Sequence, residues 1–168
     1  MDIQLNQVTR DTPELETALA LIKGFWWQHS QQNTSQDEAL GDFEAWTAEG
    51  HAFYLVMLMD QAIGFAHLGS RGAGMDWLED LFILPEYQGQ GFGSQVIRLL
   101  EKSVSQYSQS LYLEVAASNL DALRLYHRLG YDCLNTLTIR KDFHRENLRT
   151  IALETVAGLQ LDIREKKP

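Results

Sequence analysis

Residues 84–94 read Leu-Pro-Glu-Tyr-Gln-Gly-Gln-Gly-Phe-Gly-Ser, and this stretch decides how the rest of the chain is interpreted. Its three glycines lack a Cβ atom, so the backbone can turn tightly and approach a ligand closely. A strand-like run precedes it, and a helical pattern of apolar residues follows, namely Val96, Ile97, Leu100 and Val104. Backbone N–H groups at a helix start carry partial positive charge, which suits phosphate. The stretch therefore predicts an anion-binding loop, with a plain strand-to-helix turn as the alternative.

Two nucleotide-binding motifs are excluded at this loop. The dinucleotide fingerprint needs a third glycine where this chain has Ser94, and its loop follows the first strand rather than a late one. A P-loop needs Gly-Lys followed by Ser or Thr, which the stretch lacks. The bound group is therefore expected to be a phosphate of another kind of ligand.

Composition narrows the class of protein. The 168 residues are 45% hydrophobic and carry a net charge of −9, which is typical of one soluble domain and disfavours nucleic acid as a partner. The apolar run Ala52–Met59 is too short to cross a bilayer, and no signal peptide is apparent. The single cysteine, Cys133, is expected to be a buried hydrophobe rather than an acyl-carrying nucleophile. A cytoplasmic protein without a membrane partner is expected.

The pattern of apolar residues predicts a mixed sheet covered by helices. The expected strands are residues 2–8, 52–59, 62–68, 77–84, 111–116, 133–139 and 159–163, and the expected helices begin near Thr12, Asp37, Gly93 and Asn119. The Thr12 hydroxyl is expected to cap the first helix, and Asn119 and Gly130 to cap the two ends of the last one. Leu40, Phe43 and Trp46 are expected to face the core from the second helix. The strand–helix–strand unit from 77 to 116 should make its two strands parallel.

Two motifs in these positions resemble the GNAT superfamily of acetyl-CoA-dependent N-acetyltransferases. Gln88-x-x-Gly91-x-Gly93 matches the superfamily's Gln/Arg-x-x-Gly-x-Gly/Ala signature, and Asn119-x-x-Ala122-x-x-Leu125-Tyr126 followed by Gly130-Tyr131 matches its second motif. The resemblance implies an α/β (α+β) fold, with a mostly antiparallel sheet flanked by helices and a parallel strand pair splayed at the acetyl-CoA site. It covers residues 1–143 as the acetyltransferase domain. Residues 144–168 are an extension expected to add a strand to the same domain.

The resemblance also implies how coenzyme A would be bound. The backbone amides of Gly89, Gln90, Gly91, Phe92, Gly93 and Ser94 would hold the pyrophosphate, next to Gln88. The strand edge at Leu81, Phe82 and Ile83 would pair with the pantetheine arm, and Asn119 and Ala122 would lie beside it. Arg124 and Arg128 would contact an outer phosphate or form a solvated basic face.

Two residues are candidates for catalysis. Glu79 lies in Trp77-Leu78-Glu79-Asp80-Leu81-Phe82, which resembles the polyamine and diamine branch of the superfamily, and it would accept the proton of the amine. In an ideal strand Glu79 and Asp80 point to opposite faces, and Asp80 is expected to be structural. Tyr126 would protonate the departing thiolate, its alternative being a core tyrosine.

The acceptor is expected to be a small cationic amine such as a polyamine, diamine or aminoglycoside. Trp26 and Trp27 are candidates for its binding site, with one indole in the core and the other able to stack on an ammonium group. A protein or peptide amine, and a non-catalytic acyl-CoA-binding regulatory module, are the alternatives. The five histidines show no metal spacing, so no metal is expected. A homodimer is possible through the terminal strand.

Overall fold

A computed structural model describes residues 2–72 and 74–167, which form two compact units, 1–114 and 115–168. Each unit is described by itself. The first contains β1 (Ile3–Val8), α1 (Leu15–Ser30), α2 (Gln36–Trp46), β2 (His51–Leu58), β3 (Gln61–Gly69), β4 (Trp77–Ile83), α3 (Phe92–Val104) and β5 (Tyr112–Leu113). The second contains α4 (Leu120–Leu129), β6 (Leu148–Val156) and β7 (Leu159–Lys166). Short 3₁₀ turns cover Pro85–Tyr87 and Arg145–Asn147.

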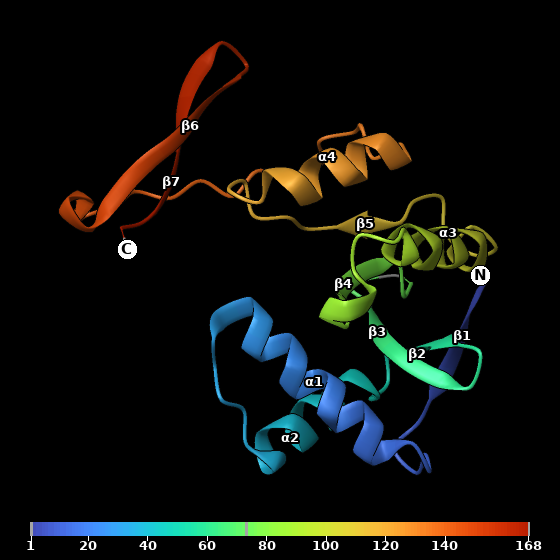
Figure 1. The fold of residues 1–168 in the computed structure, drawn as a ribbon. Coiled ribbons are helices and arrows are strands. Elements are labelled where there is room, and N and C mark those ends of the chain that lie inside the picture. The colour runs from blue at the N-terminus through green and yellow to red at the C-terminus, as the bar shows by residue number, and fades with distance from the viewer. Residues whose placement is uncertain (1, 73, 168) are drawn as a thin grey trace. The chain divides into compact units, whose positions relative to one another are not determined.

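The first unit is built on a five-stranded sheet of order β1-β2-β3-β4-β5 (Figure 1). The first four strands pair antiparallel, and β4 and β5 pair parallel, which confirms the mixed sheet and the parallel pair expected from the sequence. Helices α1 and α2 cover one face and α3 covers the other (Figure 1).

The core between the sheet and the first two helices is rich in aromatic rings. Phe43, Phe53 and Phe65 are buried and pack edge-on or stacked against one another. The buried apolar positions of α3 are those expected from the sequence, and they cover the opposite face. Leu40 is an exception, because it is 36% exposed on α2 rather than turned inward.

Local signals set the helix ends. Ser35 begins α2 with a capping box in which its hydroxyl accepts from the Glu38 amide and the Glu38 carboxylate accepts from the Ser35 amide. Asn119 caps α4 by accepting from Ala122, and Gly130 ends it with a positive φ of 100°, as predicted. The expected hydroxyl cap of α1 is absent, since Glu14 holds the N-cap position without a side-chain bond.

Two strand predictions and one burial prediction are corrected. Residues 111–116 form only the two-residue strand β5, because pairing with β4 stops at Leu78 and Leu113. Both residues of β5 are half-buried. Residues 133–139 are not a strand: among the described residues they have no pairing partner, and Leu134 and Ile139 are mostly exposed. Cys133 is likewise exposed rather than buried.

The C-terminal residues form a hairpin in the second unit. The strand expected at 159–163 is present as β7, but it pairs with β6 in a separate two-stranded sheet instead of joining the five-stranded one. Strand β6, in contrast, was not expected from the sequence. Arg149 and Glu165 pair across the two strands of this sheet. A domain boundary at residue 143 stays a prediction. Within the described residues, no helix is both long and apolar enough to cross a membrane.

Candidate active site

The glycine loop opens α3 with a row of unused hydrogen-bond donors. Gly89 and Gly91 have φ of +71° and +85°, a conformation that favours glycine, and Gly91 is the N-cap of α3. No described residue accepts a hydrogen bond from the backbone N–H groups of residues 89–94. A Cβ atom built on any of the three glycines would meet nothing within 4 Å. The loop is therefore open on its ligand side and fits a diphosphate.

Gln88 holds this loop in place. Its side-chain amide donates to the Ile83 carbonyl at 2.6 Å and to the Gln28 side chain at 2.9 Å. These bonds join the end of β4, the glycine loop and the last turns of α1. The Gln88 side chain thus supports the loop. Its place among the coenzyme-binding residues stays a prediction.

The strand before the loop has an open edge. β4 pairs with β5 only at Trp77–Tyr112 and Leu78–Leu113, so its edge away from β3 is unpaired from Glu79 to Ile83. Leu81, Phe82 and Ile83, the residues expected to pair with a pantetheine arm, lie in this open part. An extended ligand can add to such an edge by backbone hydrogen bonds.

A bulge on β4 changes where its two acids point. His67 pairs with Asp80 and Leu68 with Leu78, which leaves Glu79 as an extra residue. A Cβ atom on Gly69 would lie 3.0 Å from Glu79 Oε1, so Glu79 lies on the face of β3 that carries His67 and Gly69. Asp80 bonds to His67 on that same face. The expectation that the two acids face opposite sides is therefore wrong, because the bulge breaks the alternation.

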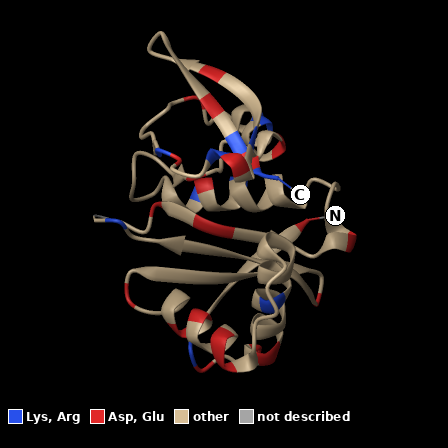
Figure 2. Ribbon diagram, turned by 90° about the vertical axis from the view of Figure 1, so that its left-hand side faces the viewer, with Lys and Arg blue, Asp and Glu red and all other residues tan. Residues whose placement is uncertain are grey.

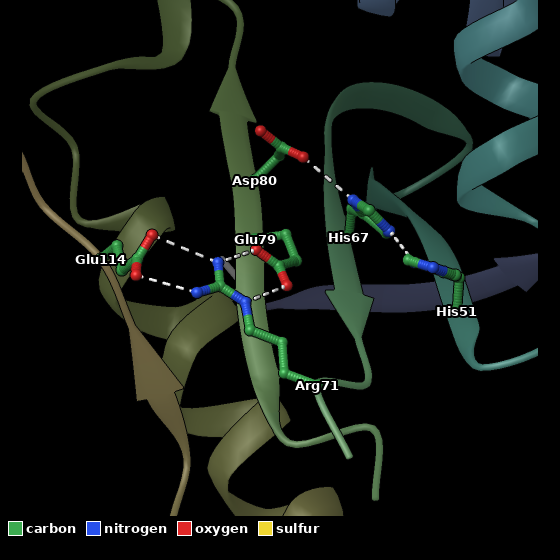
Figure 3. Close-up of polar contacts among 6 residues, drawn as sticks. All are labelled: His51, His67, Arg71, Glu79, Asp80 and Glu114. Atoms are coloured by element: carbon green, nitrogen blue, oxygen red, sulfur yellow. Dashed lines mark hydrogen bonds and ion pairs between the residues drawn. The ribbon is translucent and has the colours of Figure 1, made fainter.

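Arg71, which sequence reasoning missed, joins the splayed strands (Figure 3). Its guanidinium donates to Glu79 Oε1 at 2.9 Å and Oε2 at 2.6 Å, and to Glu114 Oε1 at 2.8 Å. It also lies 3.9 Å from the ring centroid of Trp77. The hydrogen bonds that Arg71 donates to Glu79 and Glu114 raise the pKa of Arg71, and the bond to Glu114 lowers the pKa of that carboxyl. Both oxygens of Glu79 thus accept a hydrogen bond from Arg71, and each keeps a further lone pair. The role of Glu79 as a base stays a prediction.

A second polar group lies beside this one. Asp80 is hydrogen-bonded to His67, and His67 to His51, so that the chain of bonds crosses β4, β3 and β2 (Figure 3). The histidine spacing gave no sign of this group, since the residues come from three strands. Glu79 and Glu114 share the one guanidinium of Arg71, and Asp80 follows Glu79 in β4, so the acidic side chains in this part of the sheet outnumber its one guanidinium.

The two tryptophans of α1 differ as expected. Trp26 packs against the core, and its Nε1 donates to Asp42 Oδ2 at 2.7 Å, so Asp42 is not a purely solvated residue of α2. Trp27 is 51% exposed and is the indole able to meet a ligand. The helix α2 carries acidic but no basic residues (Figure 2).

The remaining predicted residues belong to the second unit. Asn119 and Ala122 form the N-terminal cap of α4, with the Ala122 amide donating to Asn119 Oδ1 at 3.2 Å. Tyr126 lies on the same helix, and burial raises the pKa of its phenol. Its ring packs edge-on against Tyr131 at 6.0 Å.

Comparison with known proteins assigns the family. The model of the Acetyltransferase (GNAT) family matches residues 19–131, which is more than half of the chain and includes both the glycine loop and α4. The chain therefore belongs to the GNAT family, as the motifs indicated.

Curated relatives match over shorter stretches. Spermine/spermidine N(1)-acetyltransferase of Bacillus subtilis (strain 168) is 33% identical over 60 residues, which are 34% of this chain and 40% of that protein. Thialysine N-epsilon-acetyltransferase of Bos taurus is 34% identical over 83 residues, 49% of this chain and 47% of that protein. The ribosomal protein bS18-alanine N-acetyltransferase of Escherichia coli (strain K12) is 35% identical over 68 residues, 40% of this chain and 44% of that protein. The chain spans less than half the length of these relatives.

Solved structures agree on the fold. The aminoglycoside N-acetyltransferase AAC(6')-Iy in complex with CoA aligns with a TM-score of 0.64 at 20% identity, over 84% of this chain and 95% of that one. An integron cassette protein from the mobile metagenome of V. cholerae aligns with a TM-score of 0.66 at 17% identity, over 88% of this chain and 96% of that one. At these identities the likeness establishes the fold alone.

Proposed function

We propose that this chain is an N-acetyltransferase that moves the acetyl group of acetyl-CoA directly to a primary amine. The observation that carries the proposal is the set of backbone N–H groups of residues 89–94, which have no acceptor among the described residues and lie at the start of α3. These amides would bind the diphosphate of coenzyme A, and the open edge of β4 at 81–83 would bind its pantetheine arm. Membership of the GNAT family supports this assignment.

The acceptor we propose is a small cationic amine. Glu79, Asp80 and Glu114 outnumber the single guanidinium of Arg71, so an ammonium group would be attracted to this part of the sheet. The names of two relatives, a spermine/spermidine and a thialysine acetyltransferase, agree with such a substrate. Trp27 offers an exposed indole on which an ammonium group could stack.

Acetyl transfer requires an acid for the leaving thiolate. We propose Tyr126 for this step, because a phenol is protonated at neutral pH and can donate its proton to the sulfur. Burial raises the pKa of this phenol further. Asn119 and Ala122 would line the path of the pantetheine arm. Acetyl-CoA supplies the activated acyl group, and the residues of the chain bind it, attract the amine and move the protons. Glu79, held by Arg71, is proposed to provide negative charge to the acceptor site.

Two measurements test the proposal. Calorimetric titration with coenzyme A should show one site per chain, and free thiol should appear when acetyl-CoA is mixed with spermidine, a diamine or an aminoglycoside. A peptide bearing an N-terminal alanine belongs in the same panel, because one relative is an alanine N-acetyltransferase of a ribosomal protein. Coenzyme binding without thiol release on any amine would favour a non-catalytic acyl-CoA-binding module. Absence of coenzyme binding would remove the proposed function altogether.

A cytoplasmic location and a homodimer stay predictions. Sedimentation equilibrium over a range of protein concentrations tests the second of them.

A further inference from the structure

Three side chains form a hydrogen-bonded array on the face of the sheet that α1 and α2 cover. Asp80 Oδ2 lies 2.9 Å from His67 Nδ1, and His67 Nε2 lies 2.8 Å from His51 Nδ1 (Figure 3). His67 is only 3% exposed and stacks on Trp46 at 5.1 Å, so the middle of the array is fixed by packing. His51 is half-buried at the start of β2 and is the end of the array that solvent and a substrate can approach.

The chemistry of the groups determines which nitrogens carry protons. An ionised carboxylate only accepts hydrogen bonds, so His67 Nδ1 must donate to Asp80. The other nitrogen of a neutral imidazole is then an acceptor, and His51 Nδ1 must donate to it. His51 Nε2 is left with a free lone pair. A carboxylate bonded to Nδ1 fixes the tautomer of a histidine. Here Asp80 fixes the tautomer of His67, and His67 in turn fixes that of His51.

The surroundings of His51 keep it available as a base. Burial and the neighbouring His67 lower the pKa of His51, while Glu79 acts in the opposite direction. Besides these, Asp80 faces the array from β4, and Arg71 binds Glu79 from the loop before β4. From helix α2, the uncharged ring of Trp46 stacks on His67. His51 is therefore expected to be neutral at pH 7.

The array also reaches the acidic part of the sheet. His51 is the register partner of Gly69, and the Glu79 carboxylate packs directly over Gly69. The unprotonated Nε2 of His51 and the carboxylate of Glu79 thus lie in one region of the sheet. Pairing between β4 and β5 ends at this point. An ammonium attracted by the carboxylates would arrive next to a proton acceptor.

We propose that His51 is the general base that deprotonates the acceptor amine, and that Asp80 acts through His67 to position it. The inference rests on the proposed function. The N–H bond of the ammonium breaks and a bond from its proton to His51 Nε2 forms, which leaves a neutral amine. The amine nitrogen then bonds to the acyl carbon, the C–S bond breaks, and the departing sulfur takes the proton of the Tyr126 phenol. The second proton of the nitrogen passes to the Tyr126 oxygen, which restores the phenol. The proton on His51 finally returns to solvent.

The first test compares His51→Gln with wild type and with His144→Gln, a control at an exposed histidine of the second unit. Glutamine keeps a donor for His67 but cannot take a proton. With a strongly basic amine, wild-type kcat/KM should rise from low pH and level off near neutral pH. In His51→Gln it should fall by about 10²–10⁴-fold at pH 7 and keep rising with pH, because only free amine reacts. With an amine whose pKa lies below the assay pH, the two proteins should differ little.

The second test reads the tautomers without turnover. Nitrogen-15 NMR of the imidazoles should show His51 protonated at Nδ1 and bare at Nε2 near neutral pH. Asp80→Asn should disturb that tautomer and lower kcat by a larger factor than it raises KM. The fall in kcat/KM should not exceed the fall measured for His51→Gln.

A proton on His51 Nε2 with Nδ1 bare, or a wild-type pH profile in His51→Gln, would overturn the inference. If wild type acetylates no amine, the proposed function fails instead, while the NMR result still decides whether the array exists.

Discussion

Replacing Gly91 by valine tests the anion-binding loop most directly. Gly91 has φ of +85° at the N-cap of α3, and a Cβ atom built there would meet nothing within 4 Å. The cost of valine is therefore conformational rather than steric. A left-handed backbone costs an L-residue about 1–2 kcal/mol.

Two effects follow from that number. If the loop keeps its shape, the free energy of unfolding falls by about 1–2 kcal/mol, which lowers Tm by about 2–8 °C in a chain of this size. If the loop relaxes, the amides of residues 91 and 92 no longer point to the ligand. Hydrogen bonds to a charged group contribute about 1.5–3 kcal/mol each, so losing two weakens coenzyme A binding by about 10²–10⁴-fold.

Calorimetry with coenzyme A and thermal unfolding by circular dichroism measure both effects. Gly93→Ala is the matched control: Gly93 has no positive φ, its Cβ position is open, and the resembled signature accepts alanine there. The control should keep both its Tm and its affinity. Gly91→Ala provides a milder form of the change if the valine variant does not fold. A folded Gly91→Val protein that binds coenzyme A like wild type would refute the diphosphate site.

Three further variants have definite expected outcomes. Tyr126→Phe should lower kcat by about 10²–10⁴-fold while coenzyme A binds unchanged, and an unaltered kcat would make Tyr126 structural. Arg71→Gln removes the two hydrogen bonds to Glu79 and the contact with Trp77. It should lower the free energy of unfolding by about 1–2 kcal/mol, and by less in high salt than in low salt. An unchanged denaturation midpoint in low salt would contradict this contribution. Trp27→Ala should leave Tm unchanged and raise KM for the amine, and steady-state kinetics showing equal KM would exclude Trp27 from the acceptor site.

The parts of the fold that the sequence predicted well are those specified by local signals. The apolar stripe of α3, the glycine turn before it and the Asn119 and Gly130 ends of α4 depend on neighbouring residues, and all are present. The segment 133–139 shows the opposite case. Its composition is strand-like, but a strand needs a partner edge, and pairing partners are not encoded in the segment itself.

The site divides in the same way. The glycine loop could be found because one short segment contains every donor that it uses. Arg71, His51 and His67 could not be found, because each acquires its role from a strand that is distant in sequence. The predicted direction of the Glu79 side chain was wrong for a related reason. A bulge appears only in the pairing of two strands, so the alternating pattern of one strand's sequence does not reveal it.

That irregularity in β4 implies a constraint on chain length. Without the extra residue, one of the two consecutive carboxylates would turn toward α3, and either Arg71 or His67 would lose its acidic neighbour. A single-residue deletion within 77–80 could leave the hydrophobic core nearly intact and still remove one of the two ion-paired carboxylates from this face of the sheet. Among natural variants of this chain, substitutions in β4 should accordingly be far more common than changes in its number of residues.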